Sequence, residues 1–114
     1  MARYVKQLPM AYHPQDLANW THQYLLNSGF QYKEKNGEKI YQKGVGLLTA
    51  PQFIKVSFYD NMAQVEAWIK YALLPGVYVG EMGLDGFFGG IPKATLKKTV
   101  NYIESAILGQ LSVQ

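Results

Sequence analysis

The chain has 114 residues, no cysteine and a formal net charge of +3. This length predicts one domain spanning residues 1–114, able to bury a hydrophobic core without a metal or a disulfide. The lack of cysteine excludes disulfides, thiolate metal sites and a cysteine nucleophile. No apolar run is long enough for a membrane span or a signal peptide, so the sequence predicts a cytoplasmic protein.

The first predicted elements are a strand and a helix. Residues 2–8 alternate imperfectly, which favours a strand, and Pro9 prevents its continuation as a central strand. A helix over 13–28 follows, with Pro14 in its first turn and Gly29 as its stop. Its apolar side chains recur at three- and four-residue spacing and share one face: Leu17, Trp20, Tyr24 and Leu25.

Two hairpins come next, and the first has a strong turn signal. Asn36-Gly37 predicts a two-residue type I′ turn between strands over 30–35 and 38–48. The register that this turn sets places compatible side chains opposite one another, as sheet pairing favours. The predicted pairs are Lys35 with Glu38, Glu34 with Lys39, and Tyr32 with Tyr41.

The second hairpin joins 52–59 to 62–70, and residues 62–70 can be interpreted either as a strand or as a helix. Residues 62–70 are also good helix formers, which a cap at Asp60 or Asn61 would support. A two-residue turn at Asp60-Asn61 instead pairs complementary side chains on both faces, and this favours the strand. The predicted pairs are Phe58 with Ala63, Val56 with Val65, Ile54 with Ala67, Lys55 with Glu66, and Phe53 with Trp68.

A glycine-rich segment, 75–93, leads into the last helix. Only a short edge strand over 77–79 is predicted within it. The helix covers 92–108 and ends at Gly109, and residues 111–114 are expected to fray. The order β-α-β-β-β-β-α predicts a two-layer α+β domain, with an antiparallel sheet of about five strands and two helices on one face. This order resembles the repeat unit of TATA-binding-type folds in topology alone, and topology carries no function.

The sheet face opposite the helices is the first candidate functional site. A contiguous exposed aromatic patch usually marks an interaction site. A second copy of the chain or another protein would fit it, whereas Glu66 and the modest net charge weaken the case for nucleic acid. In the competing reading the segment 72–91 covers this face, and burial of the aromatic pair would then indicate a pocket or a core. The predicted interaction residues are Phe53, Lys55, Tyr59 and Trp68.

The second candidate is an anion site at the start of the last helix. Glycines there give flexible backbone N–H groups at a helix N-terminus, where anions bind readily. Lysines in the first two turns oppose the helix dipole, which a bound phosphate or carboxylate would offset. The segment matches no P-loop or dinucleotide fingerprint, so a solvated lysine face is the competing reading. The residues are Gly89, Gly90, Lys93 and Lys97, in the 81–93 loop and the helix that follows.

No catalytic residue, metal site or cofactor is predicted. The spacing of Glu81 and Asp85 in a glycine-rich loop fixes no distance between the two carboxylates. His13 and His22 have no serine or metal-ligand partner at a known spacing. The sequence therefore predicts a non-enzymatic binding or interaction domain, with a small-molecule or anion-binding domain using the 81–93 loop as the alternative.

Overall fold

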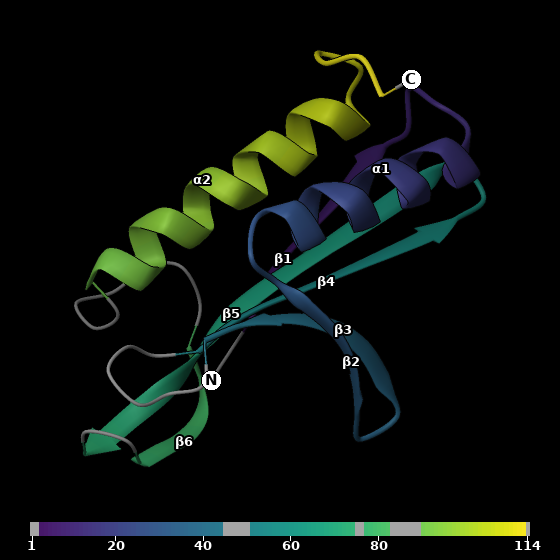
Figure 1. Cartoon of the computed structure of the whole chain (residues 1–114). Helices are drawn as coiled ribbons and strands as arrows, with labels where there is room; N and C mark the ends of the chain where they lie inside the picture. Colours follow the sequence, from purple (N-terminus) through teal and green to yellow (C-terminus); the bar gives the residue numbers. More distant parts are fainter. Residues whose placement is uncertain (1–2, 45–50, 75–76, 83–89, 114) are drawn as a thin grey trace.

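The chain forms an antiparallel sheet with two helices on one face (Figure 1). The computed structural model describes residues 3–44, 51–74, 77–82 and 90–113. Within these ranges, the side chains of residues 71–93 are not described. This arrangement confirms the predicted α+β class. In chain order the elements are β1 (Tyr4–Pro9), α1 (Pro14–Asn27), β2 (Gln31–Lys35), β3 (Glu38–Lys43), β4 (Gln52–Tyr59), β5 (Met62–Leu74), β6 (Val77–Met82) and α2 (Gly90–Ile107).

The sheet is organised around β5, which is 13 residues long. The described strands form one six-stranded sheet in the order β1-β5-β4-β3-β2, with β6 also paired to β5. One edge of β5 pairs with β4 over 62–69. Its other edge holds two strands end to end, β1 over 62–67 and β6 over 69–74. The edge strand expected over 77–79 is therefore longer, and it adds a sixth strand to the sheet.

Both hairpin registers agree with the predictions. Every predicted pair of the first hairpin is found, and Asn36 and Gly37 have the positive φ angles, 51° and 79°, that a type I′ turn requires. Every predicted pair of the second hairpin is found as well. Residues 62–74 are therefore strand and not helix, because they pair with neighbours on both edges.

Several element boundaries differ from the predictions for local reasons. Pro9 is the last residue of β1, which is tolerated because β1 lies at the edge of the sheet. His13 caps α1, since its Nδ1 accepts a hydrogen bond from the Gln15 N–H at 3.1 Å. The expected fraying of 111–114 is wrong for its described residues. The Tyr12 hydroxyl donates to the Leu111 carbonyl at 2.9 Å, and Val113 is buried.

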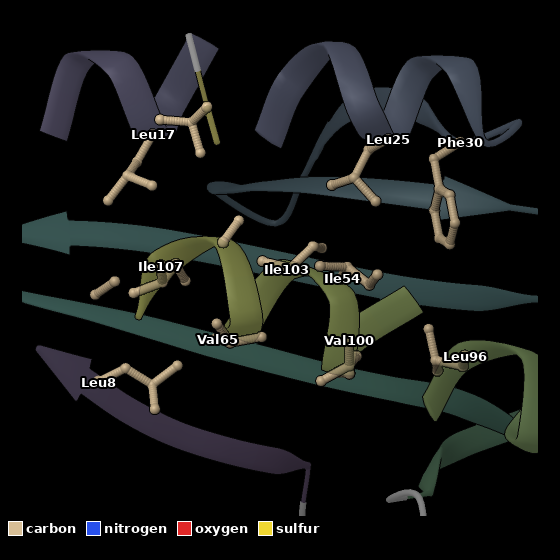
Figure 2. Close-up of a cluster of buried hydrophobic side chains, with 14 of the residues drawn as sticks. Leu8, Leu17, Leu25, Phe30, Ile54, Val65, Leu96, Val100, Ile103 and Ile107 are labelled. Atoms are coloured by element: carbon tan, nitrogen blue, oxygen red, sulfur yellow. The ribbon is translucent and has the colours of Figure 1, made fainter. Parts of the chain in front are cut away.

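The main core fills the space between the helices and the sheet (Figure 2). Helix α1 contributes Leu17 and Leu25, both completely buried. Fully burying one such side chain contributes about 1.5–3 kcal/mol. The helix residues pack against the alternate positions of β4 and β5 that face them. The labelled members in Figure 2 are Leu8, Leu17, Leu25, Phe30, Ile54, Val65, Leu96, Val100, Ile103 and Ile107.

The β2–β3 hairpin separates from the rest of the sheet after a short contact. β3 pairs with β4 only from 41 to 43, opposite 52–54. Beyond that contact the hairpin curves away from β4 and from α1 (Figure 1). As a result Val56 and Phe58, which lie on the helix-facing side of β4, are only half-buried.

Gly109 ends α2 at a position that has no room for a side chain. Its φ is +86°, and a Cβ there would lie 2.7 Å from the Ala11 Cβ. We expect Gly109→Ala to lower the free energy of unfolding by about 2–3 kcal/mol, from backbone strain and displacement of the neighbouring turn. Gly37→Ala is the matched control, because Gly37 also has positive φ but no atom within 4 Å of a new Cβ. Urea denaturation should show the larger loss for Gly109→Ala, and equal losses would contradict the close contact.

Candidate functional site

The predicted aromatic pair on the sheet face opposite the helices is formed, but it is buried. The Phe53 and Trp68 rings stack with centroids 5.4 Å apart and planes 8° apart. Each residue is 2% exposed, and with Ile40 they form a second buried cluster. The expectation of an exposed patch is therefore not met at these two rings, whose burial indicates a core or a pocket.

Charged groups cover the Trp68 ring. The Arg3 guanidinium carbon lies 3.5 Å from the ring centroid. Both of its terminal nitrogens donate to Glu38, at 2.8 and 2.9 Å, and one also donates to Glu66 at 3.2 Å. Lys55 donates to the same Glu38 carboxylate at 3.1 Å. Hydrogen bonds from Arg3 and Lys55 lower the pKa of Glu38 to about 2.

The other predicted interaction residues do not make a continuous surface with the rings. Lys55 is half-buried within the ion-pair cluster, and Tyr59 is exposed at the far end of β4. The depression beside Phe53 and Trp68 measures about 40 Å³, which is space for about one water molecule. This part of the sheet face therefore offers little room for a ligand.

The predicted anion site lies mostly outside the described residues. Gly89 and the side chain of Lys93 are outside them, Gly90 is the first residue of α2, and Lys97 is exposed. The anion site therefore stays a prediction. Among the described residues, no group of three or more histidine or acidic side chains is placed to hold a metal ion. No helix in this described portion is long and apolar enough to cross a membrane.

Two surfaces on either side of α1 were not predicted. The first, which we call the inter-helix groove, lies between α1 and α2 and has a volume of about 380 Å³. Sequence periodicity assigned Trp20 and Tyr24 to the core face, and both do pack against the main core, but each stays half-buried. No sequence pattern predicted that Tyr102 would line a surface groove, because its position there depends on how α2 packs against α1. The groove is lined by Trp20, Gln23, Tyr24, Asn27 and Tyr102.

The second surface, the helix–sheet cleft, lies where the β2–β3 hairpin diverges from β4 beneath α1. Its volume is about 210 Å³. No partner was predicted for His22, but its Nδ1 lies within hydrogen-bonding distance of the Tyr41 hydroxyl, at 2.7 Å. Burial and the nearby Tyr32 raise the pKa of Tyr41 to about 12, so its hydroxyl keeps its proton at neutral pH. The cleft is lined by Ala18, Thr21, Tyr32, Lys39, Tyr41, Val56 and Phe58.

Comparison with protein-family models, curated proteins and solved structures found no match for this chain. Function is therefore inferred from the two surfaces beside α1.

Proposed function

We propose that this chain is a non-enzymatic binding domain whose inter-helix groove holds an extended, uncharged, proline-containing segment of another protein. The observation that supports this is a cluster of three aromatic rings contributed by two helices. Trp20 and Tyr24 stack with centroids 5.0 Å apart and planes 12° apart. The Tyr102 ring centroid lies 4.9 Å from that of Tyr24, with the two ring planes inclined at 37°. Tyr102 is 45% exposed.

The chemistry of the groove favours this kind of partner. Its five lining residues carry no charge, so they suit an uncharged segment better than an acidic or a basic one. A polyproline II segment has no internal hydrogen bonds, and its carbonyls are free to accept from donors such as the amides of Gln23 and Asn27. Its rigid backbone loses little entropy on docking against aromatic rings.

The proposal keeps the class predicted from the sequence and changes the surface. The rings predicted to form the interaction surface, Phe53 and Trp68, are both buried, and Arg3 lies over Trp68, whereas Tyr102 is 45% exposed. Aromatic rings that are exposed together commonly mark an interaction site.

A capped, uncharged peptide with repeated Pro-Pro-Leu units tests the proposal. In ¹⁵N–¹H NMR titrations we expect a saturable shift of the Trp20 indole N–H signal and a much smaller change for Trp68, the second tryptophan. Tyr102→Ala should weaken binding about tenfold, because it removes one aromatic wall of the groove. The matched control is Leu108→Ala, since Leu108 is also exposed on the α2 side of the molecule but does not line the groove.

Two results would reject the proposal. One is the absence of a saturable Trp20 shift at millimolar peptide. The other is an equal response to a peptide of the same length in which alanine replaces every proline, because the preformed extended backbone would then play no part.

A further inference from the structure

The helix–sheet cleft contains a buried hydroxyl group without a partner. Thr21 is 2% exposed, and its Oγ1 makes no hydrogen bond to any residue that the structure describes. A threonine within a helix commonly bonds to the carbonyl four residues earlier, as Thr99 does to Thr95 at 3.2 Å. Thr21 is one of the residues that line the cleft, and because buried polar groups are nearly always paired, its unpaired hydroxyl is a group that a ligand bound there would complete.

The lining of the helix–sheet cleft also includes a positively charged residue, Lys39. Lys39 is exposed and makes no ion pair with the described residues, although Glu34 is its cross-strand neighbour. The lining also holds two tyrosine hydroxyls, of which that of Tyr41 is already engaged with His22 and that of Tyr32 is exposed on the surface. The groups left for a ligand are therefore the Lys39 ammonium and the hydroxyls of Thr21 and Tyr32, and all three can donate to a carboxylate.

The rest of the lining is aromatic or apolar. The ring centroids of Tyr32 and Tyr41 are 5.1 Å apart, and their planes are inclined at 52°. The His22 ring contacts both tyrosines edge-on, with centroid distances of 5.7 Å. Phe58 and Val56 supply half-buried apolar surface from β4. Such walls favour a flat, ring-containing molecule. A volume of about 210 Å³, below the roughly 300–1,000 Å³ usual for drug-sized ligands, limits that molecule to one or two rings.

We propose that the helix–sheet cleft binds a small aromatic carboxylate. Its ring packs against the tyrosines and Phe58, its carboxylate pairs with Lys39, and the Thr21 hydroxyl donates to one of its oxygens. This site lies on the opposite flank of α1 from the inter-helix groove, and neither site depends on the other.

A titration with 2-naphthoate tests the proposal on the intact chain. In ¹⁵N–¹H NMR we expect saturable shifts confined to the lining of the cleft. Lys39→Gln should weaken binding about tenfold through loss of the charge-assisted contact. Lys33→Gln should leave it unchanged, because Lys33 pairs with Ile40 on the other face of the sheet and carries the same charge. The uncharged 2-naphthamide should bind much more weakly than the acid.

Thr21→Val separates the ligand role from a packing role. The substitution keeps the shape of the side chain and removes the unpaired hydroxyl, so we expect a higher melting temperature together with weaker naphthoate binding. Unchanged affinity in this variant would overturn the role given to Thr21. Absent or scattered naphthoate shifts, equal losses in the Lys39 and Lys33 variants, or equal binding of the amide would overturn the site itself.

Discussion

Replacing Leu17 with alanine is expected to lower the free energy of unfolding by about 2–5 kcal/mol. Leu17 is completely buried in the core that joins α1 to the sheet. The loss combines the transfer free energy of the removed carbons with the cavity that remains. Since small domains are stable by only about 5–15 kcal/mol, urea denaturation followed by far-ultraviolet circular dichroism should show a much lower midpoint.

Leu26→Ala is the matched control for this experiment. Leu26 lies on the same helix but is 39% exposed, so its truncation should cost well under half of the Leu17 effect. Similar midpoints for the two variants would contradict the arrangement of α1 against the sheet.

Replacing Arg3 with glutamine should give the second large effect, a loss of about 2–3 kcal/mol at neutral pH. The substitution removes the cation above Trp68 and the paired hydrogen bonds to Glu38. It also leaves the Glu66 carboxylate, which is largely buried, without its cationic partner. Lys33→Gln removes one positive charge from the same sheet face and should change stability little. Urea denaturation of both variants makes the comparison, and equal effects would show that only net charge matters.

The same Arg3 variant should lose less stability in acid than the wild type. The pKa of Glu38 is about 2 in the folded chain, below its ordinary value of 4.5. Its contribution to stability is therefore complete above about pH 4.5 and is lost as the pH falls toward 2. Without Arg3 the pKa rises toward its ordinary value, and the stability of the variant should decline less across this window. Denaturation at pH 7 and about pH 3 measures the difference, and identical declines would contradict it.

The hairpin registers could be predicted because local chemistry sets them. A two-residue turn at Asn36-Gly37 or Asp60-Asn61 fixes which residues face each other, and the side chains on both faces then agree with that pairing. Even the ambiguous segment 62–70 was resolved in this way, because helix propensity alone does not account for pairs such as Lys55 with Glu66.

The candidate sites could not be predicted because they depend on contacts between distant segments. The Arg3 guanidinium lies over the Trp68 ring, and a hairpin register does not place Arg3 there. The helix–sheet cleft depends on where β3 leaves β4, and no residue pattern marks that point. The inter-helix groove depends on the position of Tyr102 relative to α1, whereas sequence periodicity reports only which face of a helix is apolar.

The position of β1 on the edge of β5 has a consequence for how the chain folds. β4 and β5 are consecutive strands that pair with each other. By contrast, Arg3, just before β1, contacts Glu66 of β5, which is 63 residues away along the chain. Closing so long a loop is slow relative to closing a hairpin, so β1 is expected to dock after the transition state. Arg3→Gln should then speed unfolding while leaving the folding rate close to that of the wild type. Until β1 docks, residues 62–67 of β5 present an unpaired edge, which is where the newly made chain is most open to aggregation.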